Sequence, residues 1–86
     1  MLFEFDENKS KINKQKHGID FVEAQQLFNK KTKIIPAKEI EDEIRYAAIG
    51  YINNKCYVMI FTIRNVKIRI ISVRRCRKKE KELYES

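Results

Sequence analysis

The sequence predicts an α+β domain in which helices pack on one face of a mostly antiparallel sheet. Two early segments carry the boundary signals of helices. The second half contains apolar segments of strand length, separated by turn residues. We expect the order strand, helix, helix, four strands, helix. The chain has 86 residues, of which 43% are hydrophobic, and this predicts one domain over residues 1–86 with one core.

The chain is expected to begin with a short strand and a polar helix. Residues 2–5 alternate as they do in a strand. Asp6 is a suitable N-cap for a helix over residues 7–17, and Ile12 is the apolar anchor of that helix. Gly18 is expected to end the helix in the left-handed conformation.

A capping-box spacing marks the start of the second helix. Asp20 is the predicted N-cap, and Glu23 lies three residues later. Apolar residues at helical spacing then form one buried face. Each large apolar side chain contributes about 1.5–3 kcal/mol when it is buried. We expect most of the stability from one contact, between Phe21, Leu27 and Phe28 on the helix and Val58, Ile60 and Phe61 on a strand.

Four strands are expected next, at residues 32–37, 44–52, 56–63 and 66–73. Pro36 indicates an edge strand or the end of a strand, because proline has no amide proton to donate. Residues 38–43 are read as an acidic turn, and residues 53–55 as the turn of a hairpin. The third of these strands is nearly all apolar, so we place it at the centre of the sheet. The last strand begins with the alternating apolar residues Val66, Ile68 and Ile70.

A helix over residues 75–85 is expected to close the chain, with Cys76, Leu83 and Tyr84 facing inward. Cys56 and Cys76 are the only cysteines. With the single His17 they cannot form a zinc site, so we expect reduced thiols, no metal and no cofactor. The chain lacks the features of a signal peptide and of a membrane-spanning segment, and we expect a cytoplasmic protein.

Positive charge is concentrated in the second half. Residues 1–43 contain eight Lys or Arg and nine Asp or Glu, whereas residues 44–86 contain eleven and three. Residues 64–81 alone hold nine basic residues and one acidic residue. Like charges on an ordered backbone repel one another, so this density indicates a polyanionic partner, and we interpret it as RNA. The basic residues outside the strand core are the expected RNA contacts, namely Lys67, Arg75, Arg77 and Lys78, with Lys14 and His17 on the first helix.

No familiar hydrolase motif is present, and a single histidine excludes a mechanism that uses two histidines. What remains is a set of arginines on strands, whose guanidinium groups bind phosphate and stabilise charge in its transition state. RNA can be cleaved in this way when the 2′-hydroxyl attacks its own phosphate. The base and acid are left open among Glu43, Tyr84, His17 and a lysine. Strand alternation places Arg69 and Arg74 on opposite faces unless a bulge intervenes.

Structural roles compete with each of these assignments. Arg45 is as easily a partner for an edge carboxylate as a catalytic group. Glu80 is more simply explained as a neutraliser of its basic neighbours, and His17 as a cation at a helix end. Ser72 is better explained by a hydrogen bond than as a nucleophile. The basic first helix is either a solvated surface or a phosphate contact.

The sequence resembles BrnT-type toxins of bacterial type II toxin–antitoxin systems over nearly its whole length. The segments that carry the resemblance are F-E-F-D-E-N-K at residues 3–9, K-Q-K-H-G-I-D-F-V-E-A at 14–24, E-I-R-Y-A-A-I-G at 43–50, F-T-I-R at 61–64, R-I-I-S-V-R at 69–74 and K-K-E-K-E-L-Y-E at 78–85. The resemblance implies a ribonuclease that slows translation, on a fold similar to the RelE toxins. It also implies a cognate antitoxin with a ribbon-helix-helix DNA-binding part, through which the pair reaches operator DNA.

The resemblance also implies site residues. The positions that match the family pattern are Lys14, His17, Glu43, Arg45, Arg64, Arg69, Ser72, Arg74, Glu80 and Tyr84. Two departures stand out. Ile44 occupies a position where the family usually has a second acid, and the aspartate and histidine that usually precede this acid are not evident in residues 36–42.

Two functions therefore remain open. The first is a metal-independent endoribonuclease toxin that a protein partner neutralises. The second is a module that binds nucleic acid without cleaving it, or a co-repressor. The basic charge serves both functions, and only the ends of an RNA product separate them.

Overall fold

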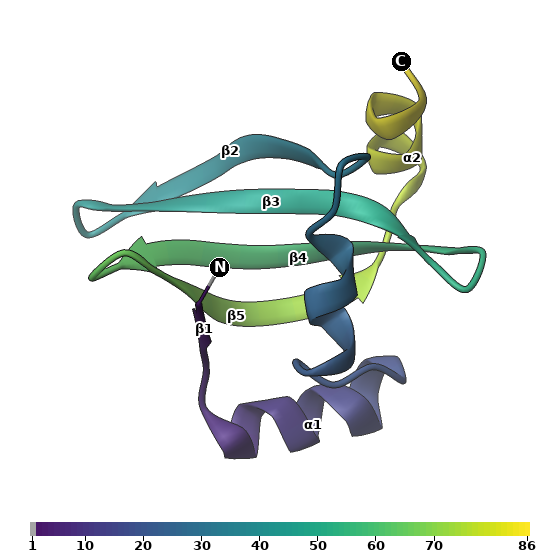
Figure 1. Ribbon diagram of the computed structural model, residues 1–86. Helices are drawn as coiled ribbons and strands as arrows, with labels where there is room; N and C mark the ends of the chain where they lie inside the picture. Colours follow the sequence, from purple (N-terminus) through teal and green to yellow (C-terminus); the bar gives the residue numbers. More distant parts are fainter. Residues whose placement is uncertain (1) are drawn as a thin grey trace.

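The computed structural model describes residues 2–86 as a five-stranded sheet with helical segments around it (Figure 1). The elements in order are β1 (Phe3–Glu4), α1 (Glu7–His17), η1 (Glu23–Leu27), β2 (Lys33–Ile40), β3 (Glu43–Ile52), β4 (Lys55–Arg64), β5 (Lys67–Arg75) and α2 (Lys78–Glu85). The α+β class and the mostly antiparallel sheet are confirmed. The second predicted helix is instead a five-residue 3₁₀ helix, η1. No helix among residues 2–86 has the length and apolar character needed to cross a membrane.

The strands lie in the order β1-β5-β4-β3-β2. β2 to β5 form an antiparallel meander, and β1 pairs with β5 in parallel. The prediction that β4 is central is confirmed. β2 is an edge strand, as Pro36 indicated, but it extends to Ile40, so the expected acidic turn over residues 38–43 shrinks to two residues.

Each hairpin closes through two residues with φ angles between 49° and 65°. This left-handed backbone matches the twist of paired strands, and Asn and Asp adopt it readily. The turn residues are Glu41 and Asp42, Asn53 and Asn54, and Asn65 and Val66. Val66 is the least suited of these residues to its position, because a β-branched side chain is strained at a positive φ. Its expected place as the first apolar residue of the last strand is wrong, since β5 begins at Lys67 and the Val66 side chain is 90% exposed.

The main core lies between η1 and one face of the sheet. Phe21 and Leu27 are fully buried there against Met59 and Phe61 of β4. The expected partners Val58 and Ile60 are wrong, because alternation along β4 turns these two side chains to the opposite face.

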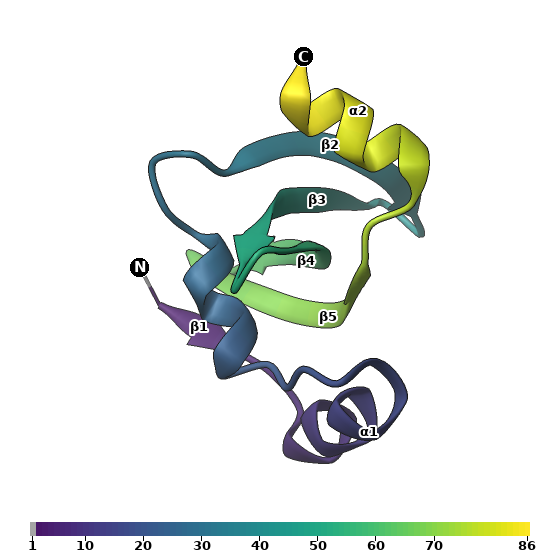
Figure 2. The ribbon, with the colours of Figure 1, turned by 90° about the vertical axis from the view of Figure 1, so that its right-hand side faces the viewer.

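The prediction that all helices pack on one face is also wrong. η1 covers one face, α2 lies over the opposite face, and α1 runs along the β5 edge (Figure 2). Under α2 a second, smaller cluster forms around Ile49 and Val58, with Tyr84 packed against it. Tyr84 therefore faces inward as expected, whereas Leu83 is 43% exposed.

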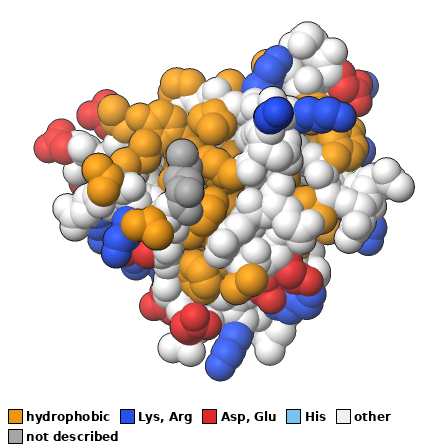
Figure 3. Space-filling model, in the orientation of Figure 1, with side chains coloured by type: hydrophobic (Ala, Val, Ile, Leu, Met, Phe, Trp, Pro, Cys, Tyr) orange, Lys and Arg blue, Asp and Glu red, His pale blue; other side chains and the backbone are white. Residues whose placement is uncertain are grey.

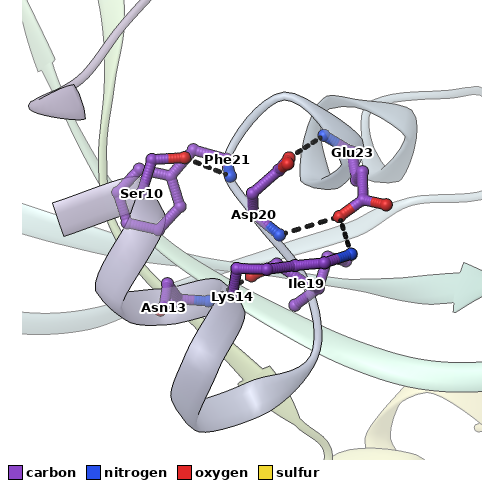
Figure 4. A network of polar contacts seen from close by, with 7 residues as sticks. All are labelled: Ser10, Asn13, Lys14, Ile19, Asp20, Phe21 and Glu23. Carbon is purple, nitrogen blue, oxygen red and sulfur yellow. Dashed lines mark hydrogen bonds and ion pairs between the residues drawn. The ribbon is translucent and has the colours of Figure 1, made fainter. Parts of the chain in front are cut away.

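Buried polar side chains, rather than Ile12, hold α1 in place (Figure 4). Ile12 is half exposed, so its predicted role as the anchor is wrong. Ser10 Oγ accepts a hydrogen bond from Phe21 N at 2.9 Å. Asn13 Nδ2 donates to Ile19 O at 2.8 Å and to Val73 O at 2.9 Å, and Asn13 Oδ1 accepts from Val73 N at 3.2 Å.

The predicted boundaries of α1 are confirmed, whereas α2 begins at Lys78 and not at residue 75, which belongs to β5. Asp6 caps α1 by accepting from Lys9 N at 3.0 Å, and Gly18 ends it with φ 75°. Asp20 and Glu23 form the reciprocal pair of a capping box, at 2.7 and 3.0 Å, although the segment that follows is 3₁₀ (Figure 4). So short a helix is typical of 3₁₀ geometry.

The expectation of two reduced thiols is wrong, since Cys56 and Cys76 form a disulfide with a Cα–Cα distance of 5.3 Å. The physical reason lies in strand pairing. Cys76 N donates to Cys56 O at 2.9 Å, which continues the β4–β5 ladder and brings the two side chains together. A separation of twenty residues gives no sign of this contact in the sequence.

Candidate nucleic-acid interface

A bulge in β5 decides where the strand arginines point. Ile60 pairs with Ser72 and Phe61 pairs with Ile70, so Ile71 is an extra residue without a partner in the ladder. Arg69 then lies opposite Thr62, and Arg74 lies opposite Val58. Alternation along β4 gives Thr62 and Val58 the same face, and the two arginines therefore share that face. This is the exception that the sequence analysis had left open.

The same face of β3 and β4 supplies further charged groups. Arg45 lies opposite Thr62 on its other side, so Arg45, Thr62 and Arg69 form a row across three strands. A pocket of about 240 Å³ surrounds this row. We name it the arginine pocket, and its lining residues are Lys9, Glu43, Arg45, Thr62, Arg64, Arg69 and Ile71.

Two carboxylates partly neutralise the arginine pocket. Glu43 accepts from Arg64 at 3.2 Å and lies 3.6 Å from Arg45 Nε. Glu4 accepts from Arg69 at 3.2 Å. Arg45 Nε is buried and has no hydrogen-bond partner within residues 2–86. This donor is therefore available to an anion that enters the pocket.

Three lining residues were missed as site residues by the sequence analysis. Lys9 comes from α1, which the β5 edge brings to the pocket. Thr62 is buried, and its hydroxyl donates to Ile44 O at 2.8 Å. Period-two alternation from Arg64 points to Thr62, whereas Lys9 and Ile71 reach the pocket only through tertiary contacts.

Arg74 shares the face but not the pocket. It lies four positions along β4 from the Arg69 row, a separation of about 13 Å. Its guanidinium donates to both carboxylate oxygens of Glu80, at 2.8 and 2.6 Å. The hydrogen bond between the two side chains raises the pKa of Arg74 and lowers the pKa of Glu80. Glu80 also accepts from Arg77 N at 2.6 Å, so this pair fixes the start of α2 to the sheet.

Tyr84 also lies on this face, away from the arginine pocket. Its ring packs on the apolar cluster under α2, with its centroid 5.4 Å from that of Tyr51. Its catalytic role stays a prediction that the geometry does not favour.

The expected RNA-contacting residues are spread more widely. Lys14 binds Glu23 at 2.8 Å, and this hydrogen bond raises the pKa of Lys14. Arg75 lies over the ring of Tyr57, on the face opposite the arginine pocket. The remaining candidates are exposed at the ends of elements, namely His17, Lys67, Arg77 and Lys78. The structure thus brings together Glu43, Arg45, Arg64 and Arg69. Lys67 lies directly opposite Arg64 at the end of the β4–β5 ladder, and the other candidates are separated from this group.

A family model described as the ribonuclease toxin BrnT of type II toxin–antitoxin systems matches residues 5–80. The chain belongs to this family. The match includes Glu43 and all four arginines of the shared face, whereas Glu4 and Tyr84 lie outside it. No curated protein matches the chain. Membership of the family implies that RNA is the substrate and that an antitoxin is the partner.

Proposed function

We propose that this chain is a metal-independent endoribonuclease in which the arginine pocket grips one phosphate of RNA. The observation that carries the proposal is the convergence of Arg45, Arg64 and Arg69 on one pocket, which Glu43 also lines. Glu43 pairs with Arg45 and Arg64. Guanidinium donors arranged in advance stabilise the charge that develops on phosphorus oxygens in the transition state. Cleavage of RNA in this way inhibits translation.

The existing ion pairs do not block such a site. An exposed pair contributes about 0–1 kcal/mol, because water screens it. The Arg64 side chain is 54% exposed, so a phosphate can displace Glu43 from it at little cost. Arg74 differs, because both terminal nitrogens of its guanidinium group already donate hydrogen bonds to Glu80. We therefore assign Arg74 a positioning role and keep Arg45, Arg64 and Arg69 for the substrate.

Glu43 is the proposed general base. Its carboxylate takes the proton from the ribose 2′-hydroxyl as that oxygen bonds to phosphorus. The bond from phosphorus to the 5′ oxygen breaks, and that oxygen takes a proton from Lys9 or from water. The products are a 2′,3′-cyclic phosphate and a free 5′-hydroxyl, which require neither a metal nor an oxidant.

The ends of the products test this function. Purified protein is incubated with a defined RNA oligonucleotide in EDTA, and the fragments are analysed by mass spectrometry. We expect fragments that end in a cyclic or 3′-phosphate, and none from the same oligonucleotide with 2′-O-methyl groups. Binding of RNA without fragments in either case would instead identify a binding module or co-repressor.

We propose further that a cognate antitoxin with a ribbon-helix-helix part neutralises the toxin in the cytoplasm and connects it to operator DNA. The family description supports the antitoxin, and the formal charge of +7 favours an acidic partner. The likeness of the fold to the RelE toxins stays a prediction that the family resemblance supports.

A further inference from the structure

Within residues 2–86, helical structure covers only part of the η1 face of the sheet. η1 lies over the end of the sheet near the β3–β4 turn, and no helix of the described residues lies over the end near the other two hairpin turns (Figure 1). Apolar side chains gather over this second end, on the left of the view (Figure 3). They line a groove of about 270 Å³, which we name the apolar groove. Its walls include Ile34, Tyr46, Phe61, Ile63, Val66 and Ile68.

Folding does not explain the exposure of three of these residues. Ile34, Ile63 and Val66 are 48%, 58% and 90% exposed, and clustered apolar side chains of this kind mark interaction sites. Val66 carries a second sign, because it holds a left-handed turn position with φ 58° at which glycine or asparagine is more stable. A strained and exposed apolar residue is retained at a cost in stability, and a function in binding explains it.

The apolar groove lies on the η1 face of the sheet and the arginine pocket on the opposite face, because Phe61 and Thr62 alternate along β4. The two sites approach each other at one end of the sheet. A third hollow at the same end of the sheet shares Tyr46 and Ile63 with the groove, and it shares Glu43 and Thr62 with the pocket. A bound segment can therefore pass around this end of the sheet, from the apolar groove on one face to a cluster of four cations on the other, namely Lys9, Arg45, Arg64 and Arg69.

We propose that the antitoxin docks here, with apolar side chains in the apolar groove and acidic side chains in the arginine pocket. The first part rests on the family, which implies an antitoxin, and on the exposed groove. The second part rests on the proposed function, since the acidic side chains occupy the donors that otherwise hold the RNA phosphate. The antitoxin thus inhibits by direct competition with RNA.

Two substitutions test the groove. Ile63→Glu places a charge in it, and Val66→Gly removes one apolar side chain while it relieves the strained turn. The affinity of each protein for the cognate antitoxin is measured by calorimetry. We expect Ile63→Glu to weaken binding at least 100-fold. We expect Val66→Gly to weaken it about tenfold although its melting temperature rises, since one buried valine contributes roughly that factor. A gain in stability with a loss of affinity separates docking from damage to the fold.

Val22→Glu is the matched control. Val22 is 63% exposed, similar to Ile63, but lies beside η1 outside the groove, and its substitution should leave the affinity within twofold. Equal affinity of wild type, Ile63→Glu and Val66→Gly for the antitoxin would overturn the proposal. A toxin dimer that Ile63→Glu dissociates, with antitoxin affinity unchanged, would assign the groove to a second copy instead and would also overturn it.

RNA separates this proposal from the proposed function. In the absence of antitoxin, the Ile63→Glu and Val66→Gly variants should cleave RNA at rates within twofold of the wild-type rate, because neither residue lines the arginine pocket. A 2′-O-methyl RNA should displace the antitoxin in competition, and a stable ternary complex would overturn the acidic contact. If wild type cleaves no RNA but Ile63→Glu still loses the antitoxin, the proposed function fails and the groove assignment holds.

Discussion

Arg69 and Arg74 have the same side chain on the same face of the sheet, yet their surroundings give them different roles. Arg69 shares a pocket with two further arginines and has one contact, at 3.2 Å, to Glu4. Arg74 makes two short hydrogen bonds to Glu80 and anchors a helix. Residue type alone therefore does not separate a phosphate ligand from a structural pair.

Substitution in the arginine pocket should affect the rate of cleavage and not the fold. We expect Arg45→Ala and Arg69→Ala to lower kcat for RNA cleavage by about 10²–10³, the usual effect of removing one positioned donor to a transition state. Arg75→Ala is the matched control, because Arg75 is a strand arginine on the opposite face. Its kcat should stay within twofold of wild type. Unchanged rates for both pocket variants would contradict the assignment.

The Arg74–Glu80 pair should contribute to the free energy of unfolding, and this contribution should depend on pH. Glu80→Gln is expected to lower the free energy of unfolding by about 1 kcal/mol at pH 7, which is the upper end for a partly exposed pair. The folded protein lowers the pKa of Glu80, mainly through its hydrogen bond to Arg74. This stabilisation is therefore present above the unfolded pKa of a glutamate and is lost as the pH falls through the folded pKa.

Urea unfolding of wild type and Glu80→Gln at pH 7 and pH 3 measures this difference. The difference in free energy of unfolding between the two proteins should be smaller at pH 3 than at pH 7. Glu82→Gln, an exposed acid on the same helix, should match wild type at both. An equal difference in free energy of unfolding at both pH values would contradict the proposed pH dependence of the Arg74–Glu80 contribution.

At the scale of elements, the polar contacts of α1 replace the apolar anchor that a surface helix usually has. Asn13 joins the chain after α1 to the end of β5 through three hydrogen bonds to backbone. Because the side chain is buried, its loss leaves buried backbone groups without partners.

We expect Asn13→Ala to destabilise the protein by about 2–3 kcal/mol, the cost of leaving such groups unpaired. Asn8→Ala on the exposed side of the same helix should change stability by less than about 0.5 kcal/mol. Chemical denaturation of both variants provides the comparison. An equal effect of the two substitutions would show that α1 is not held by Asn13.

At the scale of the whole molecule, the disulfide between Cys56 and Cys76 joins the start of β4 to the segment before α2. A cross-link of this kind stabilises mainly by restricting the unfolded chain. For a loop of twenty residues the expected contribution is about 3 kcal/mol.

Reduction should therefore lower the free energy of unfolding by about 3 kcal/mol, measured by denaturation with and without dithiothreitol. A variant with both cysteines replaced by serine should not respond to the reductant. Thiol labelling of unreduced protein should find no free thiol. Two labelled thiols together with an unchanged stability on reduction would contradict the cross-link.

The sequence by itself determined the local features, and also the class of fold and the family. The caps at Asp6 and Gly18, the reciprocal pair of Asp20 and Glu23, and the asparagine turn between β3 and β4 depend on neighbouring residues, and all were predicted. The apolar content of β4 was enough to place it at the centre, because only a central strand buries both faces.

Only the tertiary structure decided which residues meet. The extra residue Ile71 in β5 reverses every side chain after it, and nothing in the local sequence marks a bulge there. The face chosen by α2, the disulfide and the approach of Lys9 to the arginine pocket likewise depend on pairing between distant segments. A shift of one residue in register exchanges the two faces of a strand, so a site made from several strands is defined only once their pairing is known.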